Sequence, residues 1–212
     1  LAVDEQQLAQ ANDELLAQAT ALVSTARKRG EWKAAFSADQ INGWLAVDVP
    51  ENYPDLLGPE ISEPRIRLEP HHATVACHYA RGKISTVVSL DVEASMVEPN
   101  VLAVRIDRLR AGAMPLPLST VVNGLTRLAA DLEVPLRWSK SEGSPTALIT
   151  LPSMFDDDGT QYEVESVEVR DGKLYLAGRT TPPGPSSPGA PSHPPVPTTA
   201  AVGLPPNVKV HR

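Results

Sequence analysis

Residue types that commonly ligate metal ions gather between positions 71 and 78. Imidazole and thiol groups, which zinc prefers, come from His71, His72, Cys77 and His78. Along a strand, Cys77 and His78 point to opposite faces, so the four side chains cannot converge on one ion without a bulge, although His72 and His78 share a face. We interpret the group as a surface turn at His71–His72 followed by a strand with a buried cysteine, and we predict no metal site and no cofactor.

Residues 154–165 have the acidic spacing of a calcium-binding loop. Asp156, Asp158 and Glu165 fall at positions three, five and twelve of such a loop, and Gly159 falls at position six. Met154 occupies position one, where an oxygen ligand is required, and the flanking segments alternate like strands rather than helices. We therefore predict an acidic hairpin loop.

Motifs for covalent catalysis or nucleotide binding are missing from the sequence: it has no G-x-S-x-G elbow, no P-loop and no G-x-G-x-x-G turn. Asp91 and Glu93 share one face of an alternating segment, where they are spaced as solvated neighbours. A glycosidase-like carboxylate pair needs a cleft, which this pattern does not indicate. We predict that the protein is not an enzyme.

The elements that position these residues begin with an amphipathic helix over 4–29, in which Leu8, Leu15 and Leu22 recur every seven residues. Ser37 and Gln40 form a capping box that predicts a second helix over 37–47. The prolines of 50–64 predict an irregular loop, from which Tyr53, Leu56 and Leu57 either cover a pocket or fold into the core.

Alternation of period two begins at residue 65 and predicts about seven strands. The segment 84–96 has an apolar face and a polar face and would span roughly 40 Å as one strand, which indicates a long curved sheet. An antiparallel neighbour follows over 102–107, and Asp171-Gly172 predicts a tight hairpin near the end. With three helices, the fold class is α+β.

Between these strands lies the uncharged stretch 112–122, GAMPLPLSTVV. Pro115 and Pro117 donate no backbone hydrogen bond, so they end sheet pairing without leaving unpaired donors, and Ser119 caps a helix that continues to residue 132. We expect the apolar side chains of this corner to face the space between helix and sheet.

Composition restricts the partners and the number of domains. The net charge of −7 argues against nucleic acid or an anionic membrane surface as the main partner. Aromatic residues make up only 4% of the chain, so the core consists mainly of aliphatic side chains. Thr181–Pro206 has ten prolines and no charged residue, which predicts an extended tail that acts as a spacer or binds a proline-recognising protein. The predicted domains are a helix or stalk over 1–35, an α+β domain over 36–180 and a tail over 181–212.

The order of these motifs resembles the YpmS-like family of bacterial membrane-anchored extracytoplasmic proteins. The likeness runs from Phe36 to Gly178 and is most specific at Gly112–Gly124, where the family also has a glycine, a run like LPLP and a helix. The family is similar in layout to tubular lipid-binding domains, in which a long curved sheet wraps around a helix and holds an acyl chain. The resemblance implies a location at the cell envelope, with membrane association through a segment that precedes Leu1.

The expected function is therefore binding of a lipid or another apolar ligand in a groove between the helix and the curved sheet. A groove with few aromatic rings accommodates a flexible chain easily. The alternative is a structural or protein-interaction module in which the same face is a filled core. The residues expected to line the groove are Val88, Leu90, Val92, Met96, Val104, Met114, Leu116, Leu118, Val121, Val122 and Leu125.

Overall fold

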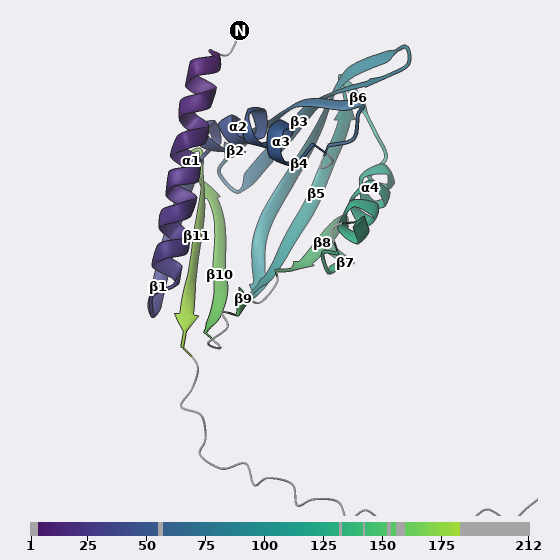
Figure 1. Cartoon of the computed structure of the whole chain (residues 1–212). Helices are drawn as coiled ribbons and strands as arrows, with labels where there is room; N and C mark the ends of the chain where they lie inside the picture. Colours follow the sequence, from purple (N-terminus) through teal and green to yellow (C-terminus); the bar gives the residue numbers. More distant parts are fainter. Residues whose placement is uncertain are drawn as a thin grey trace, which may run out of the picture.

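The computed structural model describes residues 4–54, 57–131, 133–141, 143–151, 154–155 and 160–182. Within these residues the chain forms four α-helices and eleven β-strands, which confirms the predicted α+β class (Figure 1). Their order is α1 (Glu5–Ala26), β1 (Gly30–Ser37), α2 (Ala38–Ala46), α3 (Asp48–Asn52), β2 (Ile61–Glu69), β3 (His72–Arg81), β4 (Ile84–Glu98), β5 (Val101–Ala111), β6 (Met114–Pro115), α4 (Leu118–Asp131), β7 (Leu136–Ser141), β8 (Ser144–Thr150), β9 (Met154–Phe155), β10 (Gln161–Arg170) and β11 (Lys173–Thr181). Among the described helices, none combines the length and the apolar composition that a bilayer span requires.

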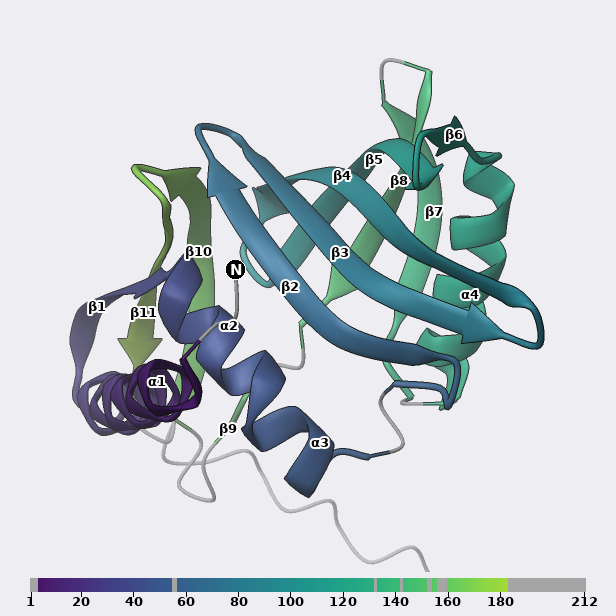
Figure 2. The same ribbon diagram turned by 90° about the horizontal axis from the view of Figure 1, so that it is seen from above.

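The described strands form two antiparallel sheets. The larger sheet has the order β2-β3-β4-β5-β8-β7, with β6 added on β5, and the smaller has the order β1-β11-β10-β9. The larger sheet stays open and does not close into a barrel over the described residues. Figure 2 shows its long strands bending across the molecule. The predicted long strand is β4, with 15 residues, and the predicted Asp171-Gly172 hairpin connects β10 to β11 with both residues at positive φ.

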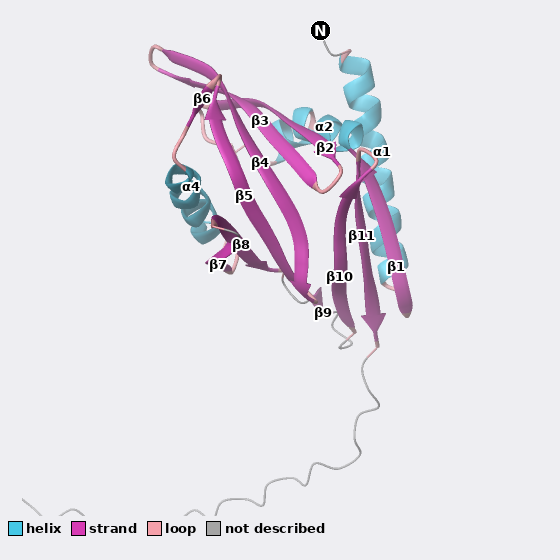
Figure 3. Cartoon of the chain, turned by 180° about the vertical axis from the view of Figure 1, so that it is seen from behind, coloured by secondary structure: helices cyan, strands magenta, loops and turns pink. Residues whose placement is uncertain are grey.

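The helix predicted between runs of strands is α4, which lies against β5 at the end of the sheet remote from α1 (Figure 1, Figure 3). A hydrogen bond from Trp138 Nε1 on β7 to Thr126 Oγ1 on α4, 2.8 Å long, ties the helix to the neighbouring edge strand. The predicted cap at Ser119 is wrong, because the helix already includes Leu118. The carbonyl of Pro117 accepts the amide of Thr120 at 3.1 Å and so closes the first turn.

The corner before α4 also differs from the prediction. Pairing with the sheet does not end at the first proline, because Met114 and Pro115 form β6 opposite Ala111 and Arg110 of β5. Proline is compatible with this position because β6 is a short edge strand, where one face of the backbone needs no partner. Gly112, at φ 58°, makes the reversal between the two strands.

The N-terminal helix is packed onto the rest of the structure. At the crossing of α1 and α2, a Cβ on Gly43 would lie 2.6 Å from the backbone nitrogen of Asn12. Strand β1 pairs with β11 along its whole length, so the predicted boundary between residues 35 and 36 falls inside a strand. The predicted capping box is present: Ser37 Oγ accepts from the Gln40 amide at 3.2 Å, and Gln40 Oε1 accepts from the Ser37 amide at 2.9 Å.

A small apolar core joins the two sheets. Leu68 and Ala73 of the larger sheet pack with Val169 of the smaller one, and Ala38 and Ile41 of α2 pack against the same cluster. Helix α2 is therefore held between the sheets by its apolar face.

Two asparagine amides add hydrogen bonds of the kind that a neighbouring strand would supply. Asn42 on α2 donates to the carbonyl of Ile66 at 2.9 Å and accepts the amide of Ile66 at 2.7 Å, on β2. Asn100, in the turn between β4 and β5, accepts the amide of Val164 at 2.8 Å and donates to the carbonyl of Tyr162 at 3.4 Å, on β10. Each amide thus satisfies backbone groups that the sheet pairing leaves over.

The proline-rich segment 50–64 is more regular than predicted. Pro50 lies in the first turn of α3, where a helix has no use for the missing N–H, and β2 begins at Ile61, four residues before the predicted start. A bulge between Ser62 and Arg65 accommodates Pro64. Tyr53 is exposed and its ring lies 6.2 Å from that of Trp44, whereas Leu56 lies outside the described residues.

Two further predictions concern residues outside the described part of the chain. The calcium-like spacing depends on Asp156, Asp158 and Gly159, which are not described. The predicted proline-rich tail is described only to residue 182, just after the end of β11.

Candidate functional site

The apolar face of the larger sheet contains the predicted strand residues of the groove. Antiparallel pairing places Val88 opposite Ala111, Leu90 opposite Leu109, Val92 opposite Ile106, Ala94 opposite Val104 and Met96 opposite Leu102. Paired residues share a face, so the five predicted strand residues belong to one continuous apolar surface across β4 and β5. All five are half-buried.

The predicted residues of the corner and of α4 lie beside this surface. Met114 is 67% exposed. The remaining corner and helix residues are half-buried, namely Leu116, Leu118, Val121, Val122 and Leu125. Since α4 lies against β5, the helix and the apolar face of the sheet are neighbours, as the sequence predicts.

The filling of this region varies from strand to strand. Ile106 is 0% exposed, and Leu109 is also buried, so these two side chains in β5 are not accessible to a ligand from solvent. Val92 packs against the core cluster of Leu68, Ala73 and Val169, so it belongs to the core rather than to a groove. All eleven predicted residues keep some contact with solvent although they belong to, or lie beside, a mostly apolar face.

Cys77 lies on the same face, opposite Val88 of β4. It is half-buried, and burial raises the pKa of its thiol above the usual range. The thiol is therefore protonated at neutral pH and behaves as a small apolar side chain. It offers a natural chemical reporter on the predicted groove.

Two cavities that the described residues form beside α1 were not predicted from the sequence. One has a volume of about 450 Å³ and lies between α1 and α2, and a second of about 900 Å³ lies between α1, the end of α2 and the start of β2. Leu8 and Arg65 line both, so the two are adjacent. Their linings contain none of the eleven predicted groove residues.

The histidine group is arranged differently from the prediction. The tight turn consists of Pro70 and His71, with His71 at φ 65°, and His72 is already the first residue of β3. Cys77 and His78 do lie on opposite faces; His78 Nε2 lies 3.0 Å from the hydroxyl of Ser85. As a strand residue, His72 shares the polar face of the sheet with Thr74, which pairs with Asp91.

Asp91 and Glu93 share the polar face of β4 and stay partly exposed, as predicted, but both are also paired with neighbouring side chains. Asp91 accepts from the Thr74 hydroxyl at 2.9 Å and lies 3.8 Å from a guanidinium nitrogen of Arg108. Glu93 forms an ion pair with Arg105 of β5. These residues make up the polar face of β4, opposite to the predicted groove.

No family model, curated protein or solved structure matches the chain. The resemblance to the YpmS-like family therefore stays a prediction that depends on the residues alone.

Proposed function

We propose that this protein is a non-enzymatic domain that binds a lipid or another apolar ligand between α4 and the apolar face of the larger sheet. The supporting observation is the row of half-buried aliphatic side chains on β4, on the corner and on α4. An ordinary core would bury such residues. Partly exposed aliphatic surface beside a helix is the kind of surface that apolar ligands use.

The free energy available from this surface limits which ligands can bind. Complete burial of a Val, Leu or Met side chain contributes about 1.5 to 3 kcal/mol, so covering the exposed part of a half-buried one contributes at most about 1 kcal/mol. The ten residues other than Val92 then offer at most roughly 10 kcal/mol, before the cost of association is subtracted. A micromolar dissociation constant needs about 8 kcal/mol. A ligand that contacts most of the row is therefore required, which favours an extended acyl chain over a small compact molecule.

The proposed place of action is the cell envelope, on the extracytoplasmic side of the membrane, as the YpmS-like resemblance implies. The partner would be a membrane lipid, and the net charge of −7 disfavours nucleic acid. Selective proteolysis of intact cells and spheroplasts that express the full-length gene, followed by immunodetection, tests this location directly.

The complete burial of Ile106 and the packing of Val92 into the core favour a second candidate function. In this case the domain is a structural or protein-interaction module, and the exposed fraction of the apolar row is covered by a protein partner. The two candidates differ in whether the purified protein alone takes up lipid.

The test uses native mass spectrometry of the purified protein and titration with a fluorescent fatty acid. Met114→Glu places a charge at the predicted groove on a residue that is 67% exposed, so the fold should tolerate it. Val97→Glu is the matched control, because Val97 is 63% exposed on the same sheet but lines a pocket with Glu93 and Arg105 on the polar face.

We expect the parent protein and Val97→Glu to bind the fatty acid equally. Met114→Glu should bind it at least about tenfold more weakly, because a bound acyl chain would cover the new carboxylate, and removing a charge from water costs more than about 1.4 kcal/mol. No uptake by the parent protein, together with no lipid in the native mass spectrum, would leave the interaction module as the function.

A further inference from the structure

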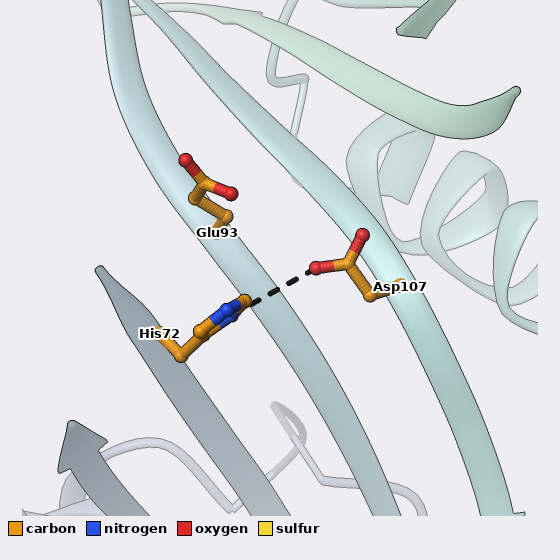
Figure 4. A group of neighbouring side chains, drawn as sticks. All are labelled: His72, Glu93 and Asp107. Carbon is orange, nitrogen blue, oxygen red and sulfur yellow. Dashed lines mark ion pairs between the residues drawn. The ribbon is translucent and has the colours of Figure 1, made fainter. Parts of the chain in front are cut away.

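The polar face of the larger sheet brings together three side chains that can ligate a metal ion. His72 comes from β3, Glu93 from the middle of β4 and Asp107 from β5, and Figure 4 shows the three on neighbouring strands. One ligand atom of each, an imidazole nitrogen or a carboxylate oxygen, lies within 4.8 Å of the others. His72 Nδ1 and Asp107 Oδ2 are 3.8 Å apart. This group is separate from the proposed lipid groove, which lies on the other face of the same strands.

A bulge in β5 explains how Asp107 reaches the group. Asp91 pairs with Arg108, but the next residue, Val92, pairs with Ile106, so Asp107 is the extra residue of β5. The bulge keeps Asp107 near Arg105 on the polar face while Ile106 stays buried on the apolar face. Bulges commonly re-aim a side chain toward a functional position.

Arg105 orients both carboxylates and leaves one oxygen of each available. Its guanidinium contacts Glu93 through Oε2 and lies 3.2 Å from Asp107 Oδ1. The second oxygen of the aspartate, Oδ2, is fully buried and has no hydrogen-bond partner among the described residues. It faces His72. A buried carboxylate oxygen without a partner lowers the stability of the fold unless a cation or a hydrogen-bond donor binds to it.

We propose that His72, Glu93 and Asp107 bind a divalent transition metal ion, with zinc as the best-matched ion. Zinc bonds of about 2.0 to 2.2 Å at a tetrahedral angle place two ligand atoms about 3.3 to 3.6 Å apart. The observed 3.8 Å between His72 and Asp107 needs an adjustment of only a few tenths of an ångström. Glu93 has three rotatable bonds and is half-buried, so it can close the remaining distance.

The surrounding charges fit a cation of this kind. Two carboxylates and one guanidinium leave a net negative charge on the group when His72 is neutral. Ligating carboxylates are usually hydrogen-bonded in their turn, which is the role that Arg105 performs here. Three protein ligands leave a fourth zinc position open to water or a small ligand, and Glu93 and Arg105 also line a neighbouring cavity of about 410 Å³.

The experiment is isothermal titration calorimetry of the untagged full chain with Zn²⁺ alone at neutral pH, combined with thermal unfolding in the presence and absence of the ion. His72→Ala and Asp107→Asn each remove one ligand. His78→Ala is the matched control, because His78 lies on the same strand and the same face, where its ring nitrogens lie 3.4 and 3.0 Å from the hydroxyls of Ser62 and Ser85. Circular dichroism in the absence of zinc checks that each variant is folded.

We expect one zinc ion per chain, a rise of the melting temperature that a chelator reverses, and affinity at least about tenfold lower for His72→Ala and Asp107→Asn. His78→Ala should bind zinc like the parent. Absence of saturable binding to the parent would overturn the proposal, as would equal losses in His72→Ala and His78→Ala, since these would indicate adventitious binding to exposed imidazoles.

Discussion

The contact between α1 and α2 predicts opposite effects for the same substitution in two helices. A Cβ on Gly43 would lie 2.6 to 2.9 Å from backbone atoms of Leu8, Ala11 and Asn12 in α1, which cannot move aside independently. Gly124 lies in α4, and no described atom outside the neighbouring backbone of that helix comes within 4 Å of an added Cβ. Gly43→Ala should therefore destabilise the protein, and Gly124→Ala should stabilise it.

The magnitudes follow from two opposing terms. Alanine is better than glycine in a helix by about 1 kcal/mol, so Gly124→Ala should raise the free energy of unfolding by about 0.5 to 1 kcal/mol. Overpacking costs about 1 to 3 kcal/mol, and backbone contacts place Gly43→Ala at the upper end of this range. After subtraction of the same propensity gain, the free energy of unfolding should fall by about 2 kcal/mol.

Urea denaturation followed by circular dichroism measures both variants against the parent. If Gly43→Ala were as stabilising as Gly124→Ala, α1 would not be packed on α2 in solution, and the N-terminal helix would be the separate stalk that the sequence also allows. A lowered midpoint with an unchanged slope is the expected result for a helix that has to shift.

Two further predictions concern the turn at Asn100 and the single cysteine. Asn100→Gly should lower the free energy of unfolding by about 1 to 3 kcal/mol, because the Val164 amide loses its acceptor. Asn100→Ala should lower it by about 1 kcal/mol more, because the φ of residue 100 is 62°, a left-handed conformation that alanine adopts less readily than glycine. Equal urea midpoints for parent and Asn100→Gly would contradict this. N-ethylmaleimide should label Cys77 slowly at neutral pH. Because burial raises the thiol pKa, the labelling rate of the folded protein should increase at a higher pH than the labelling rate of the unfolded chain. Coincident pH profiles for the two states would refute the burial effect.

Local patterns were sufficient to predict much of the fold. The polar and apolar alternation of 84–96 predicts β4, the Ser37–Gln40 box predicts the start of α2, and Asp171-Gly172 predicts the last hairpin. These signals succeed because the residues that decide each structure are close together in the chain. The placement of one apolar row on β4 and β5 also follows from alternation.

Long-range partners were not predictable in the same way. Strand β1 has the alternation of Trp32, Lys33 and Ala34, but its partner among the described strands is β11, which lies near the other end of the described chain. Trp32 is buried over Gly178, where a Cβ would lie 2.3 Å from the indole. The residues around Trp32 in the sequence do not predict this contact with Gly178.

The group formed by His72, Glu93 and Asp107 on the polar face could not be predicted from the sequence for a different reason. His72 was predicted to lie in a turn, and Glu93 and Asp107 were on strands whose register could not be known. Two bulges, at Val97 in β4 and at Asp107 in β5, set that register. A bulge depends on the packing of both faces at once, so the sequence of one strand does not indicate it.

The pairing of β1 with β11 has a consequence for how the chain is made. Among the described strands, β11 is the single neighbour of β1, and the pair joins residues 30–37 to residues 173–180. During synthesis the N-terminal segment leaves the ribosome long before its partner exists, so its backbone donors and acceptors remain available to other nascent chains. Contacts so distant in sequence also slow folding. We therefore expect the smaller sheet to be completed last, and we expect a chaperone that shields residues 30–37 until the C-terminal hairpin emerges to increase the yield of native protein.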